Sequence, residues 1–264
     1  MAAFIRPSLQ SSVSSPRIDS QTHQRSRSTS TTTMAAAAPK IKGICFDMDG
    51  TLTNSDDLHF ETYRDTLLKM APEYNNGQPL ERAFYDAKLS GSANEIIVPT
   101  LLPHWELPRM EKLWLAKEAL YRERSVNISP LPGVLRILDW CDAQKVDYVL
   151  VTNAPRIDCI HTLHSLKLHE RFDNSKIVIG QEVARPKPFP DAYNEGLRRL
   201  GLAADECIAF EDSFSGLASA VAAGIPTVAV LTSRAEGEMK EKGAFLTVKD
   251  FECPSLWEVL EGGR

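Results

Sequence analysis

The segment IKGICFDMDGTLT, Ile41–Thr53, joins a short apolar run to a loop that carries two aspartates. The apolar part does not alternate with polar residues, which is typical of a strand buried on both faces of a sheet. Runs of the same kind recur along the chain, separated by longer stretches. The predicted strands are Ile41–Asp47, Val146–Thr152, Lys176–Gly180, Cys207–Glu211 and Thr227–Leu231. This repetition predicts an α/β fold with a doubly wound, Rossmann-like parallel sheet.

Helices are expected between these strands and in one long interval that lacks any strand. The first group is Pro132–Ala143, Arg156–Leu166, Phe189–Leu200 and Phe214–Ala223, and the second is Leu58–Met70, Pro79–Lys88, Asn94–Leu102 and Pro108–Arg124. An interval of about 70 residues is too long for a simple connection. We therefore predict a core formed by residues 40–57 and 130–264, and a helical cap domain inserted at residues 58–129.

The N-terminal residues 1–39 differ in composition from the predicted fold. Residues 1–38 hold 14 Ser or Thr and four Arg against one acidic residue, Asp19, so their net charge is +3 and that of the remainder is −8. This composition is typical of an organelle transit peptide, with a disordered tail as the alternative. We expect a chloroplast location. The alternatives are a mitochondrion, or the cytoplasm for a chain that starts at Met34.

The overall composition excludes several classes of protein. Of 264 residues, 43% are hydrophobic and 25% charged, with a net charge of −5. No apolar run approaches the roughly 18–20 residues of a membrane span. The acidic balance argues against a nucleic-acid partner. The five cysteines are far apart and form no CxxC pair, which argues for a reducing environment and against structural zinc.

Polar residues gather where the predicted strands end. Ligands of an open parallel sheet bind at the carboxyl ends of its strands, so these residues are candidates for a site. Taken singly, each has an ordinary explanation as a turn, a helix cap or a surface charge. Their convergence on one sheet edge favours a functional site. The candidates are Asp47, Asp49, Thr152, Asn153, Lys187, Glu211 and Asp212.

The chemistry of these candidates points to a phosphoryl group and a hard metal ion. Strand alternation predicts that Asp47 and Asp49 point to the same side, with Met48 turned away. A cation would relieve the repulsion among so many carboxylates, and an oxygen-only ligand set favours Mg²⁺. Because the chain has no GxxxxGK[ST] loop, the phosphoryl group would come from the substrate. A carboxylate nucleophile would then form an aspartyl-phosphate that water hydrolyses.

The same residues resemble the motifs of the haloacid dehalogenase-like hydrolase superfamily, from Ile41 to about Leu260. The place of the helical insertion resembles the β-phosphoglucomutase-like group. Within that group, two segments resemble plant sugar-phosphate phosphatases. The matching parts are DMDGTLT (47–53), Thr152, Lys187 and Glu211-Asp212 for the superfamily, and KEALYR (117–122) and VTNAP (151–155) for the phosphatases.

This resemblance implies roles for the candidate residues. Asp47 would be the nucleophile and a Mg²⁺ ligand, and Asp49 the general acid/base, with its backbone carbonyl on the metal. Asp47 would have to be ionised while Asp49 is protonated. Glu211 and Asp212 would complete the metal site, and Thr152 and Asn153 would hold phosphoryl oxygens. Lys187 would hold Asp47 and the phosphoryl charge in place.

The resemblance also places the choice of substrate in the cap. The expected substrate-binding residues are His59, Gly91, Ser92 and Asn94, although His59 is equally consistent with an ordinary partly buried histidine. Asn94 stands where β-phosphoglucomutases carry an arginine that grips a second phosphate. Its loss disfavours a substrate with two phosphates.

The expected function is therefore a Mg²⁺-dependent phosphatase that hydrolyses small phosphate monoesters, either sugar or polyol phosphates. The alternative is a hexose-phosphate mutase. A catalytically silent binding protein and a C–Cl hydrolase are less consistent with the full motif set. The predicted partner is a small phosphate ester, with no nucleic acid and no membrane, and a monomer is expected to be sufficient for activity.

Overall fold

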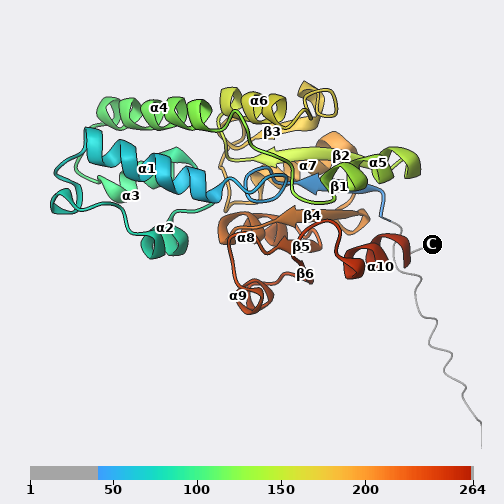
Figure 1. Cartoon of the computed structure of the whole chain (residues 1–264). Helices are drawn as coiled ribbons and strands as arrows, with labels where there is room; N and C mark the ends of the chain where they lie inside the picture. The colour runs from blue at the N-terminus through green and yellow to red at the C-terminus, as the bar shows by residue number, and fades with distance from the viewer. Residues whose placement is uncertain (1–40, 263–264) are drawn as a thin grey trace, which may run out of the picture. The chain divides into compact units, whose positions relative to one another are not determined.

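A computed structural model describes residues 41–262 of the chain, so the predicted transit peptide and the alternative start at Met34 lie outside the described residues. Six parallel strands form one sheet in the order β3-β2-β1-β4-β5-β6 (Figure 1). The strands are β1 Gly43–Phe46, β2 Asp147–Thr152, β3 Ile177–Ile179, β4 Cys207–Glu211, β5 Thr227–Val230 and β6 Leu246–Val248. The predicted parallel α/β sheet is confirmed.

Helices cover both faces of this sheet because its strands are apolar on both sides. Along β1, Ile44 and Phe46 belong to one hydrophobic cluster and Cys45 to another. The first cluster includes side chains of α5 (Val134–Gln144), α6 (Arg156–Ser165) and α10 (Pro254–Gly262), and the second those of α7 (Asp191–Leu200) and α8 (Phe214–Ala222). Helix α9 (Glu236–Glu241) packs near β5 through Met239, with Ala229 and Leu217. The strands are thus packed against helices on both faces of the sheet.

The direction of winding reverses next to β1. From β1 the chain continues to β2 and β3 on one side, and β4, β5 and β6 then follow on the other. Residues Gly43–Phe46 of β1 pair in register with Asp147–Leu150 of β2 and with Cys207–Phe210 of β4. At such a reversal the connections diverge and leave a crevice beyond the carboxyl ends of the strands. Asp47 and Glu211 stand at this crevice.

Four helices lie between β1 and α5, in the interval where no strand was predicted. They are α1 (Asp56–Met70), α2 (Arg82–Lys88), α3 (Asn94–Leu101) and α4 (Leu107–Arg124). They share a hydrophobic cluster of their own, centred on residues such as Tyr63, Val98 and Leu113. We call residues 56–124 the helical insert.

The two linkers that join the helical insert to the sheet lie side by side. Leu131 donates a backbone hydrogen bond of 2.9 Å to the carbonyl of Leu52. The hydroxyl of Thr53 donates to the carbonyl of Ser129 at 2.8 Å. The insert therefore leaves and rejoins the rest of the chain at a single point.

The C-terminal part holds three elements that the sequence pattern did not predict: β6, α9 and α10. Strand β6 is only three residues long, and two of them are partly exposed, so it lacks the buried apolar run of the other strands.

The short 3-10 turns are Tyr74–Gly77, Asn174–Lys176, Gly180–Glu182 and Ala204–Glu206.

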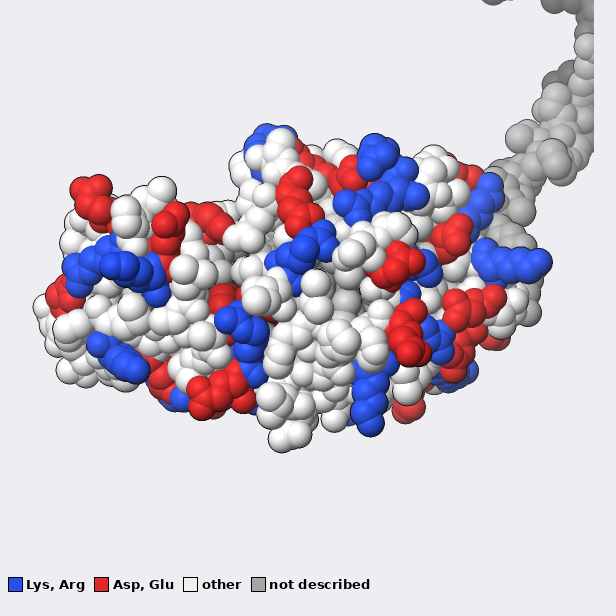
Figure 2. Space-filling view, turned by 90° about the horizontal axis from the view of Figure 1, so that it is seen from above, with Lys and Arg blue, Asp and Glu red and all other residues white. Residues whose placement is uncertain are grey.

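Charged side chains of both signs are mixed on one face of the described residues. Figure 2 shows the face over α4 and α6, on which Lys and Arg interleave with Asp and Glu instead of gathering by sign. Within residues 41–262, no helix combines the length and the apolar character that a membrane span needs.

Candidate active site

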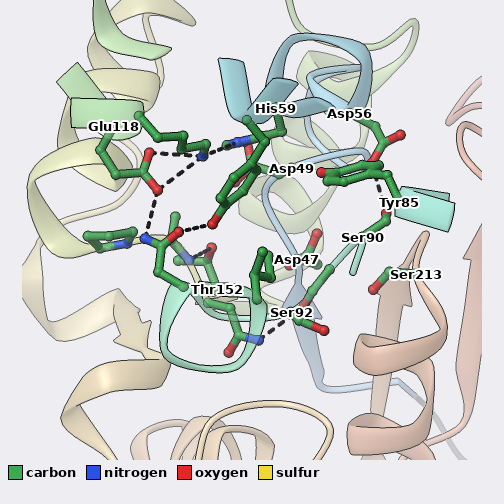
Figure 3. Close-up of a pocket in the computed structure, with 18 of the residues that line it drawn as sticks. Asp47, Asp49, Asp56, His59, Tyr85, Ser90, Ser92, Glu118, Thr152 and Ser213 are labelled. Carbon is green, nitrogen blue, oxygen red and sulfur yellow. Dashed lines mark hydrogen bonds and ion pairs between the residues drawn. The ribbon is translucent and has the colours of Figure 1, made fainter. Parts of the chain in front are cut away.

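A pocket lies between the carboxyl ends of the strands and the helical insert. Figure 3 shows Asp47, Thr152 and Ser213 from the sheet side, and His59, Tyr85 and Glu118 from the insert, around one space. Most of the predicted site residues line this pocket, and they are Asp47, Asp49, Asp212, Thr152, Asn153, His59, Gly91, Ser92 and Asn94. Lys187 and Glu211 are not among the lining residues, and both are buried.

The loop after β1 turns more sharply than a strand would. Strand β1 ends at Phe46, and the amide of Leu52 donates to the carbonyl of Met48 at 2.8 Å. Gly50 has φ +80°, and a Cβ there would lie 2.0 Å from a carboxylate oxygen of Asp212. A glycine is therefore required both by the backbone conformation and by the lack of space.

Asp47 and Asp49 both line the pocket, while Met48 between them is buried in the core. The carboxylate of Asp49 accepts at 2.7 Å from Ser55, the residue that precedes α1. Within the described residues, the side chain of Asp49 is not part of the carboxylate group that could hold a metal ion.

Three carboxylates form that group: Asp47, Glu211 and Asp212. Their oxygen atoms lie within 4.8 Å of one another, and all three residues are buried. Burial and the charges of Asp47 and Glu211 raise the pKa of Asp212 well above its ordinary value. A cation would relieve this repulsion, and a set of three carboxylates with no nitrogen or sulfur donor fits Mg²⁺.

The position of Glu211 depends on a glycine in the first turn of α8. A Cβ on Gly216 would lie 1.8 Å from Oε2 of Glu211, so only glycine leaves room for this carboxylate. The other oxygen, Oε1, accepts from the hydroxyl of Tyr193 at 2.6 Å. Tyr193 was not predicted as a site residue, because one aromatic residue on a helix is by itself a normal core residue.

Lys187 lies beneath the pocket and is not a surface charge. Its Nζ donates to Oδ1 of Asp47 at 2.7 Å, to the carbonyl of Val151 at 2.7 Å and to Oε1 of Glu211 at 2.6 Å. All three ammonium hydrogens are thus used. Burial lowers the pKa of Lys187, but the charges of Asp47 and Glu211 outweigh burial, so the pKa lies above its ordinary value. The lysine is a fixed positive charge beside the predicted nucleophile.

Asp47 and Asp49 have pKa values shifted in opposite directions. Burial and then the charge of Glu211 raise the pKa of Asp47 to about 7, in spite of Lys187. Burial also raises the pKa of Asp49, but His59 and Ser55 outweigh it and lower that pKa to about 2. These directions are the reverse of the predicted pair, an ionised Asp47 and a protonated Asp49. A bound metal ion and a phosphoryl group would add the charges that favour the predicted pair.

Thr152 is the last residue of β2, and Asn153 follows it at the edge of the pocket. The hydroxyl of Thr152 accepts from the amide of Ala154 at 3.0 Å. The side-chain amide of Asn153 donates to the carbonyls of Gly91 at 3.1 Å and of Lys187 at 3.3 Å. Asn153 therefore links the end of β2 to the insert and to the loop that carries Lys187. Their assignment to phosphoryl oxygens stays a prediction.

The insert contributes a buried chain of polar contacts that ends at Asp49. Lys117 is 2% exposed and donates to Nδ1 of His59 at 2.8 Å. Since Nδ1 accepts, Nε2 carries the hydrogen, and it lies 3.1 Å from Oδ1 of Asp49, without the alignment of a hydrogen bond. The His59 ring stacks on Tyr121 with centroids 4.2 Å apart, and the Tyr121 hydroxyl donates to Asp49 at 3.2 Å.

Lys117 and Tyr121 were not predicted as site residues, although they belong to the segment that carried the resemblance. Their spacing of four residues on α4 places them on one helix face. That face meets His59 of α1, and α1 and α4 pack closely together. A charged residue within a helix is usually solvated, so the pattern alone gives no reason to place this lysine inside.

The loop before α3 touches the sheet side directly. Gly91 has φ +78°, and a Cβ there would lie 2.3 Å from the hydroxyl of Ser213. The side chain of Gln181 also donates to Glu95. The side chain of Asn94 is buried within the insert, where its amide donates to Glu118 at 2.8 Å. The loop thus closes over the pocket, and Asn94 lines it.

Most of the chain is similar to proteins of a known family. Residues 44–230 match the model of a family described as haloacid dehalogenase-like hydrolase. A phosphorylated carbohydrates phosphatase of Thermotoga maritima is 30% identical over 227 residues, which are 83% of this chain and 100% of that protein.

Two solved structures share the fold. A family IA, variant 3 hydrolase of Entamoeba histolytica has a TM-score of 0.74 and 23% identity, covering 84% of this chain and 98% of its own. A putative β-phosphoglucomutase of Bacteroides vulgatus has a TM-score of 0.72 and 22% identity, covering 86% and 91%. At these identities the likeness concerns the fold alone.

Proposed function

The chain belongs to the haloacid dehalogenase-like hydrolase family, as the sequence motifs predicted, and we propose that it is a Mg²⁺-dependent phosphatase for sugar or polyol monophosphates. The observation that carries this proposal is the buried contact of Lys187 with Asp47 and Glu211 beside a third carboxylate, Asp212. A fixed cation and a metal-binding carboxylate group neutralise a phosphoryl group from two sides. The similarity to the Thermotoga maritima phosphatase supports the choice of substrate class.

Asp47 is the proposed nucleophile. Lys187 binds its Oδ1 and fixes the carboxylate at the floor of the pocket. Attack by a carboxylate oxygen forms a bond to phosphorus while the bond from phosphorus to the alcohol oxygen breaks. Water then attacks the phosphorus of the aspartyl-phosphate, which releases inorganic phosphate and restores the carboxylate.

Asp47, Glu211 and Asp212 are the residues that would hold Mg²⁺, with the backbone carbonyl of Asp49 as a further proposed ligand. When bound, the ion neutralises phosphoryl charge and stabilises the ionised form of Asp47. Lys187 itself binds Asp47 and Glu211, so both carboxylates have a positive neighbour of the chain's own.

Asp49 is the proposed general acid and base. It would give its proton to the oxygen of the departing alcohol and later accept one from the attacking water. Ser55, Tyr121 and His59 surround its carboxylate and fix its orientation. Without substrate, the low pKa of Asp49 favours its ionised form. A negative phosphoryl group bound beside it would raise that pKa and so favour the protonated form that the general acid needs.

We assign the helical insert the role of the predicted cap. Its two adjacent linkers, at Leu52 and Leu131, allow it to move as a unit, and Gly91 sets its contact with Ser213 on the sheet side. When closed, it excludes water from the aspartyl-phosphate. All proposed catalytic groups come from one chain, so a monomer is sufficient for activity.

A hexose-phosphate mutase is the second candidate, because the place of the helical insert after β1 resembles that of the β-phosphoglucomutase-like group. The pocket argues for hydrolysis. Asn94 takes the place of the expected arginine, and the ammonium group of Lys117 is already bonded to His59 and Glu118. Among the described residues that line this pocket, the charge of Lys117 is thus already paired with Glu118, which disfavours binding of the second phosphate of a bisphosphate intermediate.

The test is the release of inorganic phosphate by the full chain from a panel of sugar and polyol monophosphates, with Mg²⁺ and with EDTA. Asp47→Asn is the inactive comparison, because an amide cannot act as the nucleophile. Metal-dependent release that the variant loses supports a phosphatase. Interconversion of sugar-phosphate isomers with little free phosphate would support the mutase instead.

A further inference from the structure

The pocket wall opposite Asp47 holds a carboxylate, Glu118, whose role in the proposed reaction is not yet assigned. Glu118 lies on α4, is 5% exposed and lines the pocket (Figure 3). We propose that Glu118 and Asn94 form a subsite that binds a hydroxyl group of the substrate's carbon chain and rejects a second anionic group. This inference rests on the proposed phosphatase function and refines its substrate class.

The carboxylate of Glu118 keeps a free acceptor position. Its Oε1 accepts from Asn94 at 2.8 Å and from Lys117 at 3.0 Å. Its Oε2 accepts from Lys117 at 3.1 Å and from no other residue in the described part of the chain. Since each carboxylate oxygen can accept two hydrogen bonds, Oε2 has one acceptor position left.

The amide of Asn94 keeps a free donor beside that acceptor. A carboxylate cannot donate, so the side-chain nitrogen of Asn94 must face Glu118, and the amide oxygen accepts from the hydroxyl of Tyr63. The amide nitrogen carries two hydrogens, and within residues 41–262 only the one towards Glu118 has a partner. A hydroxyl group both donates and accepts, so one hydroxyl, or two neighbouring ones, satisfies both free positions.

The charges of this wall disfavour a second phosphate or a carboxylate on the substrate. Lys117 contacts Nδ1 of His59 and both oxygens of Glu118, so its charge is already paired with that carboxylate. At neutral pH a phosphate has little or no proton to donate to Oε2, and its charge repels that of Glu118. A neutral hydroxyl meets neither penalty.

The experiment compares three substrates of one chain length with the full-chain enzyme and Mg²⁺: a hexitol monophosphate, hexyl phosphate and a hexitol bisphosphate. A hydrogen bond to a charged group predicts a kcat/KM about 10- to 100-fold higher for the hexitol monophosphate than for hexyl phosphate. The bisphosphate is expected to be the poorest substrate relative to its monophosphate. These ratios need no variant.

The variant Glu118→Gln then tests whether this carboxylate causes the expected preference among the three substrates. The ratio of hexitol monophosphate to hexyl phosphate should fall towards one, and the ratio of bisphosphate to monophosphate should rise. The matched control is Glu123→Gln on the exposed side of the same helix, which should leave both ratios unchanged.

Two failures are distinguishable. If the wild type releases phosphate equally well from hexitol and hexyl esters, or if Glu118→Gln lowers all three rates by one common factor, Glu118 has only a structural role and the subsite is refuted, while the phosphatase stands. If no ester is hydrolysed at all, hexyl phosphate included, the proposed function fails and the subsite with it.

Discussion

Nζ of Lys187 lies 2.7 Å from Oδ1 of Asp47, although 140 residues separate the two in the chain. The same ammonium group binds Glu211, so one buried cation balances two carboxylates from adjacent strands. Lys187 therefore affects both the stability of the fold and the charge of the nucleophile.

Lys187→Met should damage activity and stability together. The substitution leaves Asp47 and Glu211 without a positive neighbour, which is expected to lower the free energy of unfolding by about 3 kcal/mol. Phosphate release should fall on the order of 100-fold or more, because a preorganised charge at the reacting group is lost. Urea unfolding and phosphate release measure the two effects. The exposed Lys112→Met is the control, and equal behaviour of the two variants would contradict the buried contact.

Asp212→Asn should remove the stabilisation of the fold by Mg²⁺. In the wild type, Mg²⁺ at about ten times its dissociation constant should add about 1.4 kcal/mol and raise the melting temperature. The variant lacks one carboxylate of the three, so the added ion should shift its melting temperature little. Thermal unfolding with and without Mg²⁺ gives the result. Asp205→Asn, an exposed change, should keep the full shift; a full shift in Asp212→Asn would place the ion elsewhere.

Gly91→Ala should weaken substrate binding more than folding. The new Cβ would lie 2.3 Å from the Ser213 hydroxyl, at a φ of +78° that strains any residue with a side chain. We expect the loop to shift away from the sheet side and the KM for sugar phosphates to rise, with a loss of about 1–2 kcal/mol in stability. Gly237→Ala is the matched control, because no atom lies within 4 Å of its Cβ and its helix tolerates alanine. An unchanged KM in Gly91→Ala would argue against a role for this contact in closure.

Because the pKa of Asp49 is lowered in the folded protein, the free energy of unfolding should depend on pH in a defined acidic range. Its folded-state pKa of about 2 lies below the ordinary value of 3.8, so the ionised group stabilises the fold above about pH 4. That contribution, on the order of 2 kcal/mol, should be lost as the pH falls from 4 to 2. Asp49→Asn should show a smaller fall in unfolding free energy over this range, measured by urea titration at pH 5, 3 and 2. Parallel curves for the two proteins would refute the shift.

The strand ends could be predicted because each buried strand is a continuous apolar run with a polar residue after it. Cys207–Glu211 was predicted to the residue, and Lys187 was placed at the correct edge through its motif. The surroundings of Asp49 could not be predicted from the strand pattern, because Ser55, His59 and Tyr121 approach its carboxylate from outside the sheet.

The burial of the charged pair on α4 could not be predicted from the sequence, for a different reason. Lys117 and Glu118 are adjacent charged residues on a helix, a pattern that normally indicates a solvated surface. They are buried because the helical insert folds α4 against α1 and over the strand ends, and the pattern of α4 contains no trace of that neighbour. Contacts between segments of this kind depend on tertiary packing and not on local sequence.

The meeting of the two linkers, where Leu131 bonds to Leu52, has a consequence for how such enzymes diverge. Because the segment between them begins and ends at one place, its residues can be altered, lengthened or exchanged while the strands and the Lys187 contact keep their geometry. The codons of Asp47, Lys187, Glu211 and Asp212 therefore lie outside the segment that is free to vary. A replacement insert must still supply the contacts that His59 and Tyr121 make with Asp49.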